Sequence, residues 1–206
     1  MTSKTQSLQD DLAFMRQLAE GGPASSQPQF GAAYLAGGLI YGAQCLFNWG
    51  QIEGWIRLPP GPSLVISLGF TGVFLAVMVA LTWAYRGAQP RGLTNRAVAA
   101  AFAGAGLSNC ALIAVFATVA ARHHSLTIWL LYPTVVFALQ GAVWFVVAML
   151  RRRLWMGAVA LGWWTSAVGL GLTIDSTAYV AVCGLSLILW MALPGVLMLR
   201  QARQAA

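Results

Sequence analysis

Long apolar runs separated by short polar turns make up the chain from Phe30 onward. Each of six runs holds about 20 residues or more, enough for a helix to cross a hydrocarbon core of about 30 Å. The pattern therefore predicts an all-α polytopic membrane protein with six transmembrane helices and short loops. The expected spans are residues 30–49, 63–85, 97–121, 125–150, 154–173 and 177–199.

Two polar segments flank this six-helix bundle of residues 30–199. Residues 1–29 are expected to be cytoplasmic, and the S-x-x-D sequence Ser7–Asp10 is typical of the start of an amphipathic helix. The polar face of that helix is net acidic, so we expect it to pack on the inner mouth of the bundle or on a partner, the alternative being a frayed tail. Residues 200–206 are expected to form a cytoplasmic tail. The first apolar run starts too late and is too long for a cleaved signal peptide.

Composition supports insertion in a membrane, and charge predicts its orientation. The chain is 59% hydrophobic and 8% charged, whereas a soluble domain is about 25% charged. Three adjacent guanidiniums resist translocation, so the turn at residues 151–153 is expected in the cytoplasm. Alternation then places ten of the twelve basic residues inside and only Arg57 and Arg122 outside. The net charge of +7 is therefore explained by oriented insertion, and a nucleic-acid partner is not expected. The main topology determinants are Arg86, Arg91, Arg96, Arg151, Arg152, Arg153 and Arg200.

Prolines and small residues add detail to the bundle. The cluster Pro59–Pro62 is expected to form a stiff, extended turn, and Pro194 is expected to kink the sixth span and open a cavity toward the inner leaflet. Small residues four apart let transmembrane helices approach closely. They occur in the first, third and fifth spans, which also suggests three parallel two-helix repeats. These positions are Gly38 and Gly42; Ala100, Gly104 and Ser108; and Ala158, Gly162 and Ser166.

The spans carry no Asp, Glu, Lys, Arg or His in their interiors. Proton relays, proton-coupled transporters and voltage sensors depend on such groups. Intramembrane catalysis also lacks its motifs, because H-E-x-x-H is absent and no His accompanies the serines at depth. Paired intramembrane histidines for haem are missing as well. The sequence therefore favours a protein without catalytic residues and without a cofactor.

Histidines and cysteines offer little metal chemistry. His123 and His124 share an outer turn, and adjacent histidines are weak candidates for a transition-metal site, although Arg122 beside them opposes a cation. We interpret them as polar turn residues. The three cysteines lie inside apolar runs and are interpreted as small buried hydrophobic residues.

Polar and aromatic side chains at mid-depth supply the candidate binding site. Uncharged amides in hydrocarbon most often join helices by hydrogen bonds, and buried Trp also fills cores. Together at similar depth, these side chains are typical of an apolar pocket with a few orienting polar groups. The predicted ligand-binding residues are Gln44, Asn109, Gln140, Trp164 and Trp190.

Two functions remain open at this point. The first is a protein of the bacterial inner (plasma) membrane that binds or passes an uncharged, mostly apolar small molecule or lipid through a mid-membrane cavity. The second is a membrane scaffold or regulatory subunit that docks a cytoplasmic or membrane partner through the N-terminal helix and the inner Arg loops. The lipid bilayer is the expected environment, and the glycine-rich faces could also mediate a homo-oligomer.

Overall fold

The computed structural model describes residues 27–87 and 92–204, and its regular structure within these ranges is entirely helical. The predicted amphipathic helix near Ser7 and the topology determinant Arg91 lie outside these ranges. The elements, in chain order, are α2 Gln27–Ile52, α3 Pro60–Ala84, α4 Leu93–His123, α5 Leu126–Arg151, α6 Leu154–Leu172, α7 Ala178–Leu187, the π-helical segment η1 Ile188–Ala192, and α8 Leu193–Gln204.

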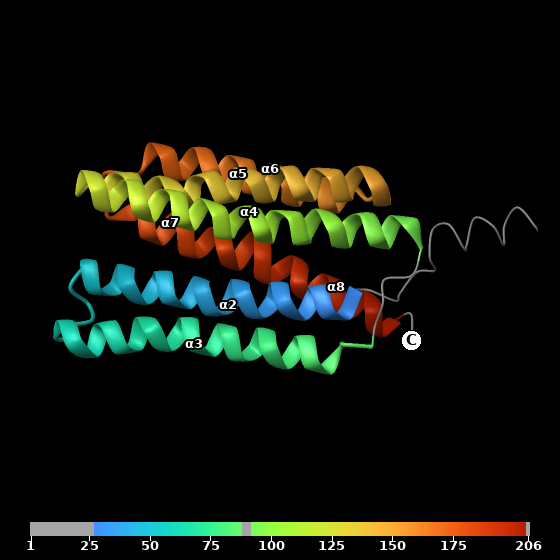
Figure 1. Cartoon of the computed structure of the whole chain (residues 1–206), viewed down its shortest axis with the longest axis horizontal. Helices are drawn as coiled ribbons and strands as arrows, with labels where there is room; N and C mark the ends of the chain where they lie inside the picture. Colours follow the sequence, from blue (N-terminus) through green and yellow to red (C-terminus); the bar gives the residue numbers. More distant parts are fainter. Residues whose placement is uncertain (1–26, 88–91, 205–206) are drawn as a thin grey trace, which may run out of the picture.

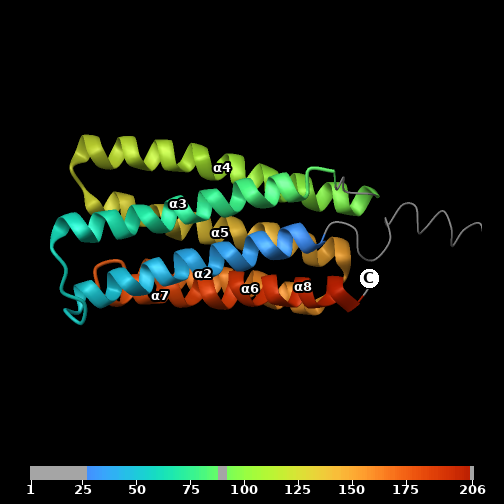
Figure 2. The same ribbon diagram turned by 90° about the horizontal axis from the view of Figure 1, so that it is seen from below.

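The helices lie side by side along the long axis, and their connections alternate between the two ends of the bundle (Figures 1 and 2). The links α2–α3, α4–α5 and α6–α7 lie at one end. The link α5–α6, the C-terminal end of α3, the start of α4 and the end of α8 lie at the other. This second end carries Arg86, Arg96, Arg151, Arg152, Arg153, Arg200 and Arg203. The basic turns therefore gather at one end of the bundle, as the charge pattern requires.

Five helices are long and apolar enough to cross a membrane: Pro28–Ile52, Pro60–Ala84, Leu93–His123, Leu126–Arg151 and Ala178–Gln204. The chain thus has the build of a multi-pass membrane protein. Helix α6 has 19 residues but is not among these five, because polar and indole side chains such as Trp163, Thr165 and Ser166 lower its hydropathy. Eight of its residues are buried against neighbouring helices, so less of its surface has to be compatible with lipid.

Helix α3 begins earlier than expected, and the extended turn predicted for the proline cluster is wrong. Pro60 and Pro62 lie in the first turn of α3, and Pro59 is its N-cap with an extended backbone. The first backbone N–H groups of a helix have no partner within the helix, so proline loses nothing there. Those prolines therefore start the helix instead of delaying it.

The last span is one continuous run of helix that changes type midway. Pro194 lacks an N–H, so the usual hydrogen bond to the carbonyl four residues earlier cannot form. Immediately before it, residues Ile188–Ala192 adopt π-helical geometry, and the Leu193 N–H donates to the Ile188 carbonyl. Such π-bulges commonly accommodate this kind of disruption.

Close backbone contacts hold α2 against the last span. A Cβ added to Gly38 would lie 2.4 Å from the Ala192 nitrogen, and one added to Gly195 would lie 2.5 Å from the Leu35 nitrogen. Gly42 likewise faces Gly184, whose carbonyl would be 3.3 Å from an added Cβ. The predicted packing role of the glycines in the first span is therefore confirmed.

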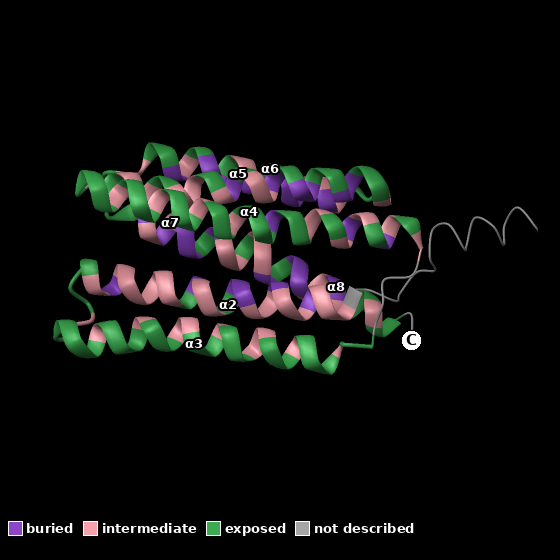
Figure 3. Cartoon of the chain, viewed as in Figure 1, coloured by how far each residue is buried: buried purple, intermediate pink, exposed green. Residues whose placement is uncertain are grey.

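The helices form two groups. Helix α2 packs on α3, α7, η1 and α8, while α5 packs on α4 and α6; α6 joins the groups through α7 and η1. Helices α5, α6 and α7 each carry at least five buried residues, whereas the long helix α4 has three and α3 has none (Figure 3). The first span is thus central and the third peripheral. The three-repeat interpretation is therefore wrong, because spans one and three occupy unlike positions.

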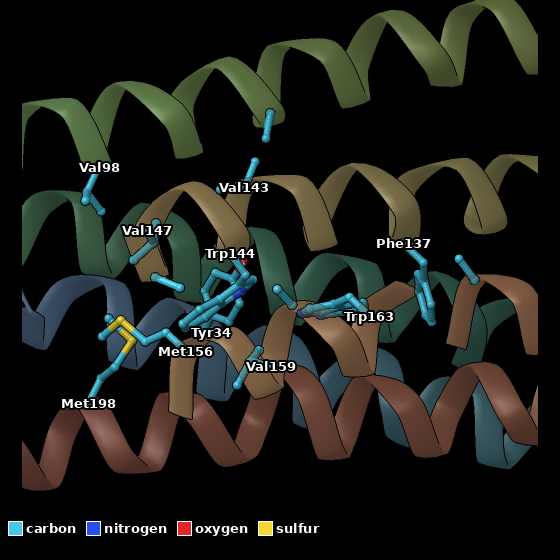
Figure 4. Close-up of a cluster of buried hydrophobic side chains, with 14 of the residues drawn as sticks. Tyr34, Val98, Phe137, Val143, Trp144, Val147, Met156, Val159, Trp163 and Met198 are labelled. Atoms are coloured by element: carbon cyan, nitrogen blue, oxygen red, sulfur yellow. The ribbon is translucent and has the colours of Figure 1, made fainter. Parts of the chain in front are cut away.

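Large aromatic side chains fill the centre of the bundle (Figure 4). Trp144, Trp163, Leu170 and Pro194 are the largest fully buried side chains. Phe137 of α5 packs edge-on against Trp163 of α6, with ring centroids 4.7 Å apart.

Small residues of α6 allow close contact with the last span. Gly162 makes room for the Trp190 ring, since an added Cβ would lie 2.4 Å from it, and Ser166 accepts a 2.9 Å hydrogen bond from Ser186. The small positions Gly162 and Ser166 therefore serve packing as predicted.

Candidate functional site

A hydrogen-bonded chain of three side chains joins the two groups of helices. The Tyr34 hydroxyl of α2 donates to the Gln140 side-chain carbonyl of α5 at 2.8 Å, and the Trp144 indole N–H donates to the Tyr34 oxygen at 3.1 Å. Gln140 and Trp144 are four residues apart and therefore share one face of α5. Tyr34 is 7% exposed and Trp144 is 1% exposed, so these hydrogen-bonded side chains lie in the core.

Aromatic rings from three helices surround these hydrogen-bonded side chains. Phe102 of α4 packs edge-on against Tyr34 at 5.4 Å and against Trp144 at 6.0 Å, and Phe30 of α2 lies 5.5 Å from Phe102. Tyr34 and Trp144 also contact each other edge-on at 5.4 Å (Figure 4). Phe30 and Phe102 are only half-buried. The site is therefore an aromatic junction of α2, α4 and α5 whose rim is partly open.

The hydrogen bonds fix which way the Gln140 amide points. The carbonyl oxygen of Gln140 faces Tyr34, which lets the Tyr34 hydroxyl donate its proton while its oxygen accepts from Trp144. The Gln140 Nε2 group consequently points away from Tyr34, and it donates to no side chain or carbonyl in residues 27–87 and 92–204. Gln140 is half-buried, and its amide nitrogen keeps some exposed surface. The Trp163 indole nitrogen, by contrast, is fully buried and has no hydrogen-bond partner among the residues described. The site therefore presents an amide donor.

The other predicted site residues lie on separate helix pairs. Gln44 donates to the Ser67 carbonyl at 3.2 Å and joins α2 to α3, and Asn109 accepts from Tyr132 at 2.8 Å and joins α4 to α5. The Trp164 indole donates to the Ala138 carbonyl at 3.1 Å and joins α6 to α5. The Trp190 ring packs over Gly162. The five residues are therefore distributed through the bundle, and only Gln140 belongs to the aromatic junction.

Sequence reasoning missed Tyr34 and Phe102 as members of the site. Tyr34 lies near the start of the first apolar run, where a tyrosine is normally interpreted as interfacial. The available signal was the spacing of Gln140 and Trp144, which places a polar and an indole group on one helical face. No spacing within the sequence indicates which other helices that face meets.

The remaining candidate ligands lie at the surface. His123 and His124 are both exposed at the end of α4, where His124 adopts a left-handed conformation with φ of 47°. The His124 N–H donates to the Ala120 and Ala121 carbonyls, which closes the tight turn into α5. In the part of the chain that the structure describes, no three His, Cys, Asp or Glu side chains gather as a metal site.

The fold and this junction define the chain as an α-helical, multi-pass membrane protein with a polar position in an aromatic core. Compared with known proteins, the chain matches no protein-family model, no curated protein and no solved structure.

Proposed function

We propose that this protein binds, and in doing so passes through the membrane, an uncharged and mostly apolar small molecule or lipid. The observation that carries the proposal is the uncommitted amide of Gln140 beside the half-buried rings of Phe30 and Phe102. In hydrocarbon an unpaired N–H is costly, so a ligand that offers an acceptor oxygen there gains a hydrogen bond at little competing cost from water. A mostly apolar pocket with few orienting polar groups is the usual design of small-molecule sites.

The chemistry of the junction limits the ligand class. Aromatic rings favour a flat or chain-like apolar body, and the free amide favours a carbonyl, ether or hydroxyl oxygen. In the described residues, α2 carries no Asp, Glu, Lys, Arg or His, and α4 and α5 carry such residues only near their ends, so a charged ligand at Gln140 would have no counterion. Binding is therefore expected to be independent of a buried carboxylate and of proton coupling. Of the residues predicted from sequence, Gln140 takes the orienting role, while Gln44, Asn109, Trp164 and Trp190 position the helices around it.

The division of the bundle into two groups supports a passage as well as a binding role. The α2 group and the α5 group meet through α6, α7 and η1 and through the Tyr34–Gln140–Trp144 chain. A ligand bound at this contact would move the two helix groups apart or together. Movement of one helix group against another is a common way for membrane proteins to open a binding site to one side of the membrane. The half-buried rings of Phe30 and Phe102 are the side at which a ligand would approach from the lipid.

Orientation and location complete the proposal. The protein crosses the inner (plasma) membrane of a bacterium six times, with α6 as the fifth span and both termini in the cytoplasm. The gathering of the basic turns at one end of the bundle supports this, because arginine-rich turns stay on the cytoplasmic side. The burial of eight α6 residues supports its place as a span, because less of its surface would face lipid.

Native mass spectrometry of the protein, extracted in polymer-bound membrane discs, tests the proposal. We expect the wild type to retain a co-purified apolar compound or lipid, and Gln140→Leu to retain about tenfold less, as expected for the loss of one hydrogen bond worth about 1.4 kcal/mol. Asn48→Leu is the matched control. Asn48 is an amide of the α2–α3 interface, with its carbonyl 3.4 Å from the Ser67 hydroxyl. Equal retention in wild type and Gln140→Leu would contradict the proposal.

A second function, that of a membrane scaffold or regulatory subunit, is favoured by the exposed periphery. Helix α3 has no buried residue and packs closely on α2 alone, which leaves most of its apolar surface for lipid, another copy or a partner. The N-terminal segment through which docking was expected lies outside the residues described. Deletion of residues 1–22 separates the two functions: a docking protein loses its partners in a pull-down, and a ligand-binding protein keeps its co-purified compound.

A further inference from the structure

Two cysteines from opposite ends of the chain meet between α2 and α7. The Sγ atoms of Cys45 and Cys183 lie 3.9 Å apart, with the Cys45 thiol directed toward Cys183. Cys183 is 7% exposed, and Cys45 is half-buried. The third cysteine, Cys110 on α4, is exposed and makes no hydrogen bond to another sulfur among the residues described. The two facing thiols are therefore a distinct pair.

The helix backbones are already in contact at the level of this pair. A Cβ added to Gly184 would lie 2.9 Å from the Cys45 Cβ and 3.1 Å from the Gly42 carbonyl. A disulfide needs Cα atoms within about 7 Å and a sulfur–sulfur bond of about 2.05 Å. The backbones touch one residue away from Cys183, and the two sulfurs are already 3.9 Å apart, so the step to a disulfide requires a sulfur displacement of about 2 Å.

We propose that Cys45 and Cys183 form a redox-active dithiol, which a membrane-soluble two-electron oxidant of the quinone class converts into a disulfide between α2 and α7. In this step the two thiols give up two protons and two electrons and a sulfur–sulfur bond forms. The quinone takes up the same two protons and two electrons and leaves as the quinol. The stoichiometry is one disulfide for each quinone reduced.

The depth of the cysteine pair in the membrane limits which oxidants can reach it. Cys45 lies seven residues before the end of α2, about 10 Å along the helix axis, so the pair is well inside the span. A water-soluble disulfide such as oxidised glutathione does not reach that depth, whereas a quinone dissolves in the bilayer. Partial exposure of Cys45 gives the oxidant one sulfur to approach. Oxidation would fasten α2 to α7, within one group of helices and away from the Gln140 site.

The test is a count of free thiols in the full chain, held in lipid nanodiscs. Reduced protein is exposed to a short-chain ubiquinone and then denatured. Its free thiols are alkylated, and the number of alkyl groups is measured by mass spectrometry. We expect three alkylated cysteines before oxidation and one afterwards, with a peptide pair that links Cys45 to Cys183. Oxidised glutathione at equal concentration is expected to leave all three thiols free.

Single variants make the result specific. Cys110→Ser is expected to change the count from two thiols to none, and Cys45→Ser or Cys183→Ser is expected to retain both remaining thiols. Three free thiols in folded wild type after quinone treatment would overturn the proposal. So would a disulfide that joins Cys110 of two molecules without a Cys45–Cys183 link. Neither result bears on ligand retention at Gln140, which is measured separately.

Discussion

Tyr34 and Gln140, 106 residues apart in the chain, are joined by a 2.8 Å hydrogen bond that connects α2 to α5. These helices belong to different groups of the bundle and are not closely packed on each other. A side-chain bond therefore spans the contact between the groups. The same tyrosine oxygen accepts from Trp144, and the Gln140 amide N–H groups find no acceptor among the residues described.

The Tyr34→Phe variant removes the hydroxyl that both neighbours use. The buried Trp144 indole N–H loses its acceptor, and Gln140 loses its donor. We expect the free energy of unfolding to fall by about 1–3 kcal/mol, the cost of leaving a buried polar group unpaired. The midpoint of unfolding in detergent with increasing dodecyl sulfate measures this change.

Tyr41→Phe is the matched control for Tyr34→Phe. Tyr41 lies on the same helix and packs its ring 4.7 Å from Phe74, but its hydroxyl makes no hydrogen bond with the residues described. Its loss is expected to change stability by less than about 0.5 kcal/mol. Equal effects of the two variants would mean that the Tyr34 hydroxyl does not stabilise the contact between the helix groups.

The Gly38→Ala variant tests the close packing of α2 on the last span. The added methyl would lie 2.4 Å from the Ala192 nitrogen, and because that atom belongs to the backbone the helices must separate. We expect a loss of about 1–3 kcal/mol, as for other overpacked sites. Unfolding in dodecyl sulfate again provides the measurement.

Gly104→Ala is the corresponding control on α4. A Cβ at Gly104 meets no atom within 4 Å, so the methyl group adds no clash. The higher helix propensity of Ala, worth up to about 1 kcal/mol in water, makes the expected change neutral or stabilising. If both variants were equally destabilised, either Gly38 would not be in contact with Ala192 or another surface would cover Gly104.

Orientation in the membrane is tested by single cysteines at positions 123 and 152 in a chain whose native cysteines are replaced by Ser. The links that hold these positions lie at opposite ends of the bundle. Because the arginine-rich turn is expected in the cytoplasm, an impermeant maleimide added to intact spheroplasts should label position 123 and spare position 152. Labelling of both positions, or of position 152 alone, would contradict the proposed topology.

The periodicity of the chain predicted an all-helical protein with helices long and apolar enough to cross a membrane, and the structure confirms this. Such helices can be recognised from local sequence because hydrocarbon thickness sets their length. The errors arose where the role of a residue depends on its position in a helix or on the neighbouring helices. Pro60 was expected to exclude helix, yet it lies at a helix start, where its missing N–H has no consequence. Ala100, Gly104 and Ser108 match the packing pattern of the first span but lie on an exposed face.

The candidate site was harder to predict than the fold. The depth of a residue in the membrane follows from its position within an apolar run, and this depth selected Gln140 and the other mid-depth residues. Their rotation about the helix axis and the identity of the facing helix are tertiary properties. Gln44 and Asn109 therefore resembled Gln140 in sequence, although they join other helix pairs. Tyr34 could be connected to Gln140 only once α2 and α5 were placed.

Photolabelling with an uncharged diazirine probe, a long apolar chain bearing one carbonyl oxygen, tests the central claim most directly. The reaction is carried out on the full chain in lipid bilayers, and the labelled peptides are sequenced. We expect saturable labelling of the α2, α4 and α5 segments around Tyr34, Phe102 and Gln140, competed by excess unlabelled probe and lost in Gln140→Leu. Labelling spread over the exposed face of α3, without saturation and unchanged in Gln140→Leu, would contradict binding at this junction.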